Sequence, residues 1–232
     1  SYAAAAGADL VIAHDPDADR CAAAVPVPDA DGAAVAWRRL TGDELGALLA
    51  DDLMRRRVAG TYATTIVSSS LLGAMAAARG VDYAETLTGF KWIVRAADEL
   101  AYGYEEALGY AVAPELVRDK DGISAGVVLA AIAARLKAEG SSLLRRLDEL
   151  AMEFGLHATD QLSIRVGRLA EIDQMMARVR TRPPQQLLGA AASMQDLAPD
   201  ADVVTLRFDG GRVVIRPSGT EPKLKAYLEA VL

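Results

Sequence analysis

The sequence predicts an α/β protein followed by a small α+β domain, and three observations support this fold class. Up to about residue 156, short apolar runs alternate with helical patterns, which is typical of a largely parallel or mixed sheet covered on both faces. Beyond His157, apolar residues alternate singly, as in a half-exposed antiparallel strand. Asp209-Gly210-Gly211 then separates two further apolar runs, which predicts a hairpin. We expect three regions, at residues 1–57, 58–156 and 157–232.

The composition narrows the classes of function. The 232 residues carry a net charge of −7 and no basic run, so we expect neither nucleic acid nor an anionic membrane as a partner. The single cysteine, Cys21, lies in an apolar strand pattern and cannot form an internal disulfide, which favours a cytoplasmic location. Because the chain begins with Ser1-Tyr2 and its first strand follows at once, we expect it to be a piece of a longer protein.

In the first region, we expect strands at residues 10–13, 21–26 and 35–40, with a turn at 28–32. Thr41 and Glu44 have the spacing of a capping box, which predicts that a helix begins there. Three arginines, Arg55 to Arg57, place positive charge at the negative end of the helix dipole. We interpret them as a helix end rather than a binding patch.

The second region alternates strands and helices. We expect strands at 63–67 and 81–86, a strand that runs into a loop at 102–110, and helices at 71–79, 93–99 and 123–139, with a further helix from Ser141 or Ser142 to before Gly155. Gly80 and Gly140 follow two of these helices, where glycine commonly ends one. The third helix should bury an apolar stripe of Val127, Val128, Ile132 and Leu136. Ligands of such sheets collect beyond the carboxyl ends of strands.

The third region should contain a strand around residues 162–166, a helix at 169–180, and a hairpin formed by 203–208 and 212–216. Pro183-Pro184 ends the helix. A last strand or short helix should begin at Lys223.

The first motif with chemical meaning follows the strand at 10–13. Asp15, Asp17 and Asp19 alternate, and an extended or looped backbone can turn all three toward one point. Unpaired carboxylates would repel one another, whereas a hard cation such as Mg²⁺ prefers oxygen ligands. Arg20 is placed to hold a phosphate beside the metal. A solvated acidic loop is the alternative; a calcium EF-hand is excluded, because Arg20 occupies the position of its turn glycine.

The second motif lies near the carboxyl terminus. Arg216 offers a planar fork of donors, Ser218 and Thr220 add hydroxyl groups, and Gly219 lets backbone amides approach closely. These residues could form a phosphate cradle. A plain turn is the alternative, since proline, serine and glycine are turn residues.

Four other residues are candidates. Lys91 suggests a contact to an anion or sugar, or a solvated charge, and Glu105 with Glu106 could grip vicinal sugar hydroxyls or cap a helix. Lys120 could transfer a proton, bind phosphate or lie free on the surface. His14 is interpreted as a hydrogen-bonded structural residue, and His157 receives no role.

The motifs, in this order, resemble those of the alpha-D-phosphohexomutase family, which includes phosphoglucomutases and phosphomannomutases. The matching segments are DPDADR (15–20), TGFKW (88–92), EEALGY (105–110), DKDG (119–122) and RPSGTEPK (216–223). The resemblance implies a mixed-sheet phosphohexomutase fold: residues 1–57 as the end of domain 2 with the metal loop, 58–156 as the sugar-binding domain 3, and 157–232 as a phosphate-binding domain 4.

The resemblance also implies roles for the residues. Asp15, Asp17 and Asp19 would hold Mg²⁺; Arg20 and Lys120 would act near the transferred phosphoryl group; Lys91 and Glu105 would bind the sugar; and Arg216, Ser218, Gly219 and Thr220 would bind the other phosphate. Many relatives have serine where this chain has Ala107, so the chain lacks the side chain for one hydroxyl contact to the sugar. The expected ligands are sugar monophosphates and bisphosphates.

One departure from the family pattern concerns the nucleophile. The family transfers phosphoryl groups through a phosphoserine in a motif resembling T-A-S-H-N-P, yet His14 follows Ala13 and His157 follows Leu156. We therefore expect the catalytic serine in a missing N-terminal domain and this chain to be inactive by itself. The alternatives are a phosphopentomutase-type mutase, a phosphatase with Asp15 as nucleophile, and a non-catalytic module that binds sugar phosphates.

Overall fold

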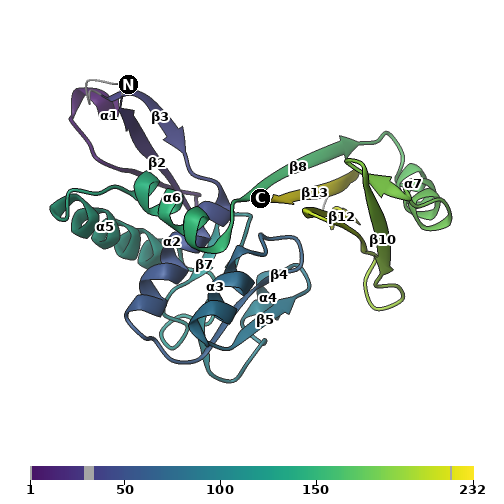
Figure 1. Cartoon of the computed structure of the whole chain (residues 1–232), viewed down its shortest axis with the longest axis horizontal. Helices are drawn as coiled ribbons and strands as arrows, with labels where there is room; N and C mark the ends of the chain where they lie inside the picture. Colours follow the sequence, from purple (N-terminus) through teal and green to yellow (C-terminus); the bar gives the residue numbers. More distant parts are fainter. Residues whose placement is uncertain (1, 29–33, 220) are drawn as a thin grey trace. The chain divides into compact units, whose positions relative to one another are not determined.

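The computed structural model describes residues 2–28, 34–219 and 221–232, and its elements follow the alternation expected from the sequence (Figure 1). The chain divides into two compact units, Ser1–Phe154 and Gly155–Leu232. The expected turn at residues 28–32 lies largely outside the described residues.

The first unit contains two sheets. A three-stranded antiparallel sheet has the order β1-β2-β3, and a four-stranded mixed sheet has the order β5-β4-β6-β7. In the mixed sheet, β4 is parallel to both β5 and β6, so the carboxyl ends of these three strands lie at one edge. The strands of the two sheets together are β1 (Val11–His14), β2 (Cys21–Pro28), β3 (Ala34–Arg39), β4 (Thr61–Thr65), β5 (Tyr83–Thr86), β6 (Leu100–Glu105) and β7 (Gly109–Ala111).

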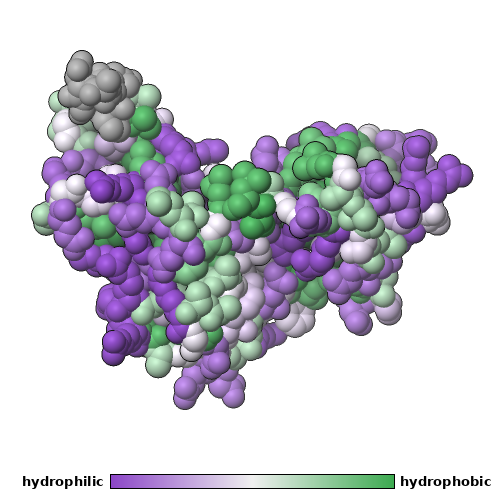
Figure 2. Space-filling view, in the orientation of Figure 1, coloured by the Kyte–Doolittle hydropathy of each residue, from purple (hydrophilic) through white to green (hydrophobic). Residues whose placement is uncertain are grey.

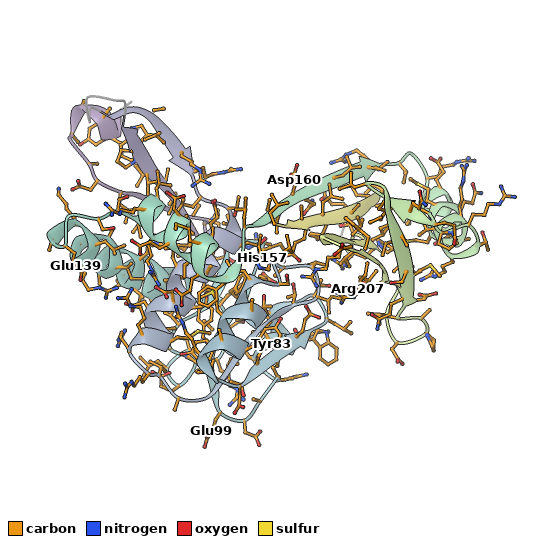
Figure 3. All side chains as sticks on the ribbon, viewed as in Figure 1. Tyr83, Glu99, Glu139, His157, Asp160 and Arg207 are labelled. Carbon is orange, nitrogen blue, oxygen red and sulfur yellow. The ribbon has the colours of Figure 1, made fainter. Side chains whose placement is uncertain are left out.

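The helices of the first unit are α1 (Tyr2–Ala5), α2 (Gly42–Arg55), α3 (Leu71–Arg79), α4 (Phe90–Ile93), α5 (Gly122–Ala138) and α6 (Leu143–Phe154). The capping box at the start of α2 is confirmed: Thr41 accepts from the Glu44 amide at 3.1 Å, and the Glu44 carboxylate accepts from the Thr41 amide at 2.9 Å. Gly80 ends α3 in the left-handed conformation, also as expected. On β5, Tyr83 lies against Gly73 of α3, where a Cβ would come within 3.2 Å of its ring (Figure 3).

The mixed sheet presents different residues on its two faces because side chains alternate along a strand. One face carries a row of buried tyrosines, of which Tyr102 and Tyr110 donate hydrogen bonds to the carbonyls of Gly46 and Gly42 in α2. On the other face, Gly103 leaves room for Ile93 of α4, since a Cβ there would meet Ile93 Cγ2. Small residues on this face thus bring α4 close to the sheet.

Two expectations about helices were wrong. The helix expected at 93–99 is only the short α4, which ends at Ile93. The Arg118 guanidinium donates to the carbonyls of Val94 and Ala97, both at 3.1 Å. A longer helix would pair the Val94 carbonyl with the amide of Asp98 instead. Val127 is 65% exposed and does not belong to the buried stripe of α5.

The second unit is a six-stranded antiparallel sheet in the order β8-β13-β12-β11-β10-β9, with helix α7 (Leu169–Thr181). Its strands are β8 (His157–Arg165), β9 (Gln186–Leu187), β10 (Ala190–Asp196), β11 (Val204–Phe208), β12 (Gly211–Pro217) and β13 (Lys223–Val231). Ile172 and Met176 of α7 pack on Val204, Leu206 and Leu224 to form a separate core. β8 is an edge strand of this sheet, and its Leu162 is 54% exposed. The face of the molecule in Figure 2 is mostly hydrophilic, with apolar patches scattered over it.

Cys21 is fully buried in the core of the first unit. Among the described residues, the helices are too short or too polar to span a membrane.

Candidate functional site

The three aspartates converge in the loop between β1 and β2. Ligand atoms of Asp15, Asp17 and Asp19 all lie within 4.8 Å of one another. Ala18 adopts a left-handed conformation with φ of 58°, and its amide donates to the Asp15 carbonyl at 3.0 Å. This tight turn reverses the backbone and directs alternate carboxylates to the same side.

The donor set of this loop fits a hard divalent cation. All three side chains offer carboxylate oxygens, the ligands that Mg²⁺ prefers. Asp19 Oδ1 is buried and has no hydrogen-bond partner among the described residues, an arrangement that is costly unless another group binds it. Desolvation raises the pKa of Asp15, but hydrogen bonds and the Arg20 guanidinium outweigh it and hold the pKa below its ordinary value. The carboxylate is therefore ionised at neutral pH, as a metal ligand must be.

Backbone contacts fix this loop against the end of the mixed sheet. Arg20 forms an isolated β-bridge with Gly109 of β7, and the Cys21 amide donates to the Leu108 carbonyl at 3.1 Å. On the other side, the amide of Gly122 at the start of α5 donates to the Ala18 carbonyl at 3.1 Å. The loop that carries the three aspartates thus lies between β7 and α5, although residues of these elements are about 90 to 100 positions away.

These contacts bring Arg20, Glu105 and Lys120 to the aspartates. Lys120 Nζ lies 2.5 Å from Asp19 Oδ2. A Cβ at Gly109 would lie 3.0 Å from Glu105 Oε1 and 3.1 Å from Lys120 Cδ, so both side chains cover this glycine. Four residue types expected to act together are therefore neighbours within the first unit.

The charged groups of this cluster shift one another's pKa values. Desolvation lowers the pKa of Lys120, but the hydrogen bond from Lys120 to Asp19 and the neighbouring carboxylates outweigh it and raise the pKa above its usual value. Desolvation raises the pKa of Glu105, while the charges of Lys120 and Arg20 oppose that rise. The cluster can hold a cation and present two positive side chains to an anion.

The structure separates Glu105 and Glu106, which the sequence treated as one pair. Ser68 Oγ donates to Glu106 Oε2 at 3.1 Å, and the Glu106 amide donates to Ser68 Oγ at 3.2 Å. Burial, together with the charge of Asp43, raises the pKa of Glu106 to about 7. Glu106 thus holds the turn after β6 against the turn after β4, a role that sequence reasoning missed.

Lys91 lies on α4 rather than in a loop. Its side chain is exposed, and Nζ lies 5.2 Å from the centre of the Trp92 ring. The structure does not bring Lys91 into contact with the aspartate cluster. Its expected contact to a sugar stays a prediction.

The second motif lies between β12 and β13 in the second unit. Arg216 is half-buried on β12, the Ser218 amide donates to the Lys223 carbonyl at 2.8 Å, and Gly219 is exposed. Thr220 lies outside the described residues. Within the described part of the chain, the Arg216 guanidinium makes no ion pair.

The register of this hairpin places cations opposite one another. Arg216 pairs across strands with Lys225, and Lys223 pairs with Arg165 of β8. Like charges directly opposite are unfavourable, so an anion would stabilise this end of the sheet. Glu221 neutralises part of the charge, since Lys223 Nζ lies 2.8 Å from its carboxylate. Sequence reasoning missed Lys225; the hairpin register would have placed it opposite Arg216.

Comparison with known proteins shows that both units match domains of a single protein family. Residues 41–151 match the description "Phosphoglucomutase/phosphomannomutase, alpha/beta/alpha domain III", and residues 168–231 match the C-terminal domain of the same family. A Haemophilus influenzae protein named as a probable phosphomannomutase is 43% identical over 96% of this chain and 46% of its own length. A Mus musculus phosphopentomutase is 34% identical over 96% of this chain and 42% of its own length.

Solved structures share the fold. Parafusin, a phosphoglucomutase from Paramecium, has a TM-score of 0.74 at 23% identity and covers 97% of this chain and 41% of its own. A phosphoglucomutase/phosphomannomutase family protein from Burkholderia thailandensis has a TM-score of 0.69 at 15% identity. The match covers 100% of this chain and 44% of the Burkholderia chain. The chain spans about half the length of the relatives it matches.

Proposed function

The chain belongs to the phosphoglucomutase/phosphomannomutase family, and from that premise we propose that it is the Mg²⁺- and substrate-binding portion of a sugar-phosphate mutase. The reaction is reversible intramolecular phosphoryl transfer on a sugar phosphate. The observation that carries the proposal is the assembly of Arg20, Glu105 and Lys120 with the three aspartates around Gly109. We also propose the division into residues 1–57, 58–156 and 157–232.

Asp15, Asp17 and Asp19 would hold Mg²⁺, which supplies charge stabilisation for the phosphoryl group when it is bound. Arg20 would bind the oxygens of that group with its guanidinium fork. Lys120, with its raised pKa, would remain an ammonium at neutral pH and add a second positive charge. Charge neutralisation of this kind accounts for much of catalysis in phosphoryl transfer.

Glu105 and Lys91 would orient the sugar hydroxyls, and Arg216, Ser218, Gly219 and Thr220 would bind the phosphate that is not transferred. The opposed cations of β12 and β13 support the second role. Binding that phosphate would align the sugar and convert binding energy into orientation.

A phosphoserine that these motifs do not include would donate and recover the phosphoryl group. The chain by itself should therefore bind a sugar bisphosphate without turning over the monophosphate. We expect this portion to act together with an N-terminal domain of the same protein.

A coupled assay from glucose 1-phosphate to glucose 6-phosphate, with catalytic glucose 1,6-bisphosphate, tests this proposal beside calorimetry. We expect no turnover by the chain alone, and binding of the bisphosphate that Glu105→Gln weakens about tenfold, through loss of a charge-assisted hydrogen bond. Glu99→Gln, at an exposed carboxylate after a turn, is the control and should bind as the unmodified chain does. Robust turnover by the chain alone, or binding that ignores Glu105, would contradict the proposal.

A pentose phosphate is the second candidate substrate. The 34% identity to a protein named phosphopentomutase, together with Ala107 in place of a hydroxyl residue, favours it. Calorimetry with ribose 1,5-bisphosphate beside glucose 1,6-bisphosphate distinguishes the two, and tighter binding of the pentose would select this candidate.

A further inference from the structure

An open pocket of about 740 Å³ in the first unit is lined by four arginines, Arg55, Arg57, Arg79 and Arg146, and one acidic residue, Glu153. Its volume lies in the range of pockets for small ligands. The whole chain has a net charge of −7, so a pocket with four arginines differs from the rest of the chain in the sign of its charge.

Two of the arginines are bound to a buried carboxylate. Arg146 forms a two-armed contact to Asp51, at 2.8 and 2.9 Å, and Arg79 Nη2 lies 2.7 Å from Asp51 Oδ1. Desolvation raises the pKa of Asp51, but these two arginines outweigh it and lower the pKa, so the carboxylate stays ionised. Asp51 thus fixes two guanidinium groups in the wall of the pocket. Arg146 also pairs with Glu149 at 2.7 Å, and Arg79 lies 3.9 Å from Glu153. The positive charge that these carboxylates leave over lies on Arg55 and Arg57.

The other two arginines are available to a ligand. Arg55 has a side chain that is 54% exposed and reaches only the same Asp51, at 4.0 Å. Arg57 is exposed, and within the described part of the chain no carboxylate lies within ion-pairing distance of it. These two side chains are the ones that an anion would attract.

The backbone fixes the position of Arg57. Its amide donates to the Met54 carbonyl at 2.9 Å, and the Val58 amide donates to the Leu53 carbonyl at 3.0 Å, which together form a Schellman motif. Arg57 has a φ of 59°, a left-handed conformation that glycine adopts freely and other residues adopt only with strain. Arginine occupies this position despite the backbone strain. The strain gains nothing for the fold, so we attribute the arginine to what its side chain does in the pocket.

The pocket lies at the opposite end of the parallel strands from the metal loop. Val58 precedes β4 and Val81 precedes β5, whereas the proposed catalytic groups follow the carboxyl ends of the strands. Met54, Val58 and Val81 give the pocket an apolar wall beside its cationic one. The expected ligand therefore combines an anionic group with an apolar or planar body.

We propose that this pocket, which we call the arginine pocket, is a second binding site, separate from the mutase site, for a small organic phosphate. Arg55 and Arg57 bind the phosphate oxygens, because a guanidinium fork matches them. Arg79 and Arg146, held by their carboxylate partners, form a fixed polar wall, and the apolar residues contact the organic part.

Calorimetry with adenosine 5′-monophosphate and with inorganic phosphate tests the proposal. All proteins carry Arg20→Gln and Arg216→Gln and are kept in chelator, which removes the two arginines proposed to bind phosphate elsewhere and any bound metal. We expect saturable binding of the nucleotide that Arg57→Gly weakens at least tenfold, while the melting temperature stays equal or rises, because glycine adopts this φ without strain. The nucleotide should bind more tightly than inorganic phosphate, since only it can contact the apolar wall.

Arg145→Gln is the matched control, since Arg145 lies on α6 beside Arg146, has a side chain that is 70% exposed and does not line the pocket. It should bind as the parent does. If Arg145→Gln and Arg57→Gly weakened nucleotide binding equally, the affinity would depend only on the overall surface charge, and the proposal would be overturned. Unchanged binding in Arg57→Gly, or no saturable binding of either probe, would overturn it as well, and none of these outcomes bears on the proposed mutase function.

Discussion

At the scale of single residues, neighbouring glutamates in one motif have different environments. Glu105 lies among charged groups, where Lys120 and Arg20 oppose the rise of its pKa. Glu106 turns toward Ser68 and Thr65, and burial raises its pKa to about 7. One residue of the motif is suited to bind a ligand, and the next is suited to hold the turn that presents it.

The raised pKa of Glu106 predicts a pH dependence of stability. Between pH 4.5 and 7 the folded state holds a proton on Glu106 that the unfolded state has lost, so the free energy of unfolding should fall as pH rises through this window. The loss amounts to at most about 3 kcal/mol. Glu106→Gln should remove it, and urea unfolding of both proteins at pH 4.5 and pH 7.5 measures the difference. Equal pH slopes in the two proteins would show that Glu106 ionises normally.

The sequence could predict the part of the site whose residues lie close together along the chain. The alternate aspartates converge as expected, because one left-handed residue in a short loop is enough to bring them together. The separation of Glu105 from Glu106 could not be predicted. It depends on Ser68, 38 positions away, which reaches Glu106 only in the folded sheet.

At the scale of elements, the start of α5 supports the metal loop. The Gly122 amide donates to the Ala18 carbonyl, and a Cβ at Gly122 would lie 2.3 Å from the Arg20 carbonyl oxygen and 2.7 Å from that of Ala18. Such contacts with backbone atoms cannot be relieved by a side-chain rotation. The glycine therefore sets how closely the helix and the loop approach.

Gly122→Ala should displace the loop, destabilise the first unit by about 1–3 kcal/mol and weaken Mg²⁺ binding severalfold. Gly126→Ala, one turn further along α5, meets its nearest atoms at 3.4 Å and improves helix propensity, so it is the matched control. Denaturant unfolding and Mg²⁺ titration compare the two. If both variants bind Mg²⁺ as the parent does, the close approach at Gly122 has no part in forming the site.

Elements with strong local signals were predicted well, and those that depend on distant partners were not. The capping box correctly marks the start of α2, and Gly80 the end of α3. The helix expected at 93–99 stops at Ile93, and Arg118, 24 positions from Val94, binds the Val94 carbonyl that a longer helix would use. β10, rich in alanine and polar residues, carries little intrinsic strand preference and becomes a strand by pairing with β11.

At the scale of the whole molecule, each unit has its own apolar core. The first unit packs α2 on the tyrosine face of the mixed sheet and α4 on its other face, and the second unit packs α7 on an antiparallel sheet. In the sequence, the pattern changes from alternating elements to alternating residues near His157, close to the boundary between the two units at Gly155. Each unit also carries one of the two motifs, which supports separate contributions to substrate binding.

The central claim is that Asp15, Asp17 and Asp19 bind the Mg²⁺ through which this chain binds a phosphorylated sugar. Calorimetric titration of glucose 1,6-bisphosphate with and without Mg²⁺ tests it most directly, in the parent, in Asp17→Asn, and in Asp9→Asn as an exposed control. We expect Mg²⁺ to increase affinity at least tenfold in the parent and in Asp9→Asn, and to have no effect in Asp17→Asn. An equal response to Mg²⁺ in all three proteins, or no response in the parent, would contradict the claim.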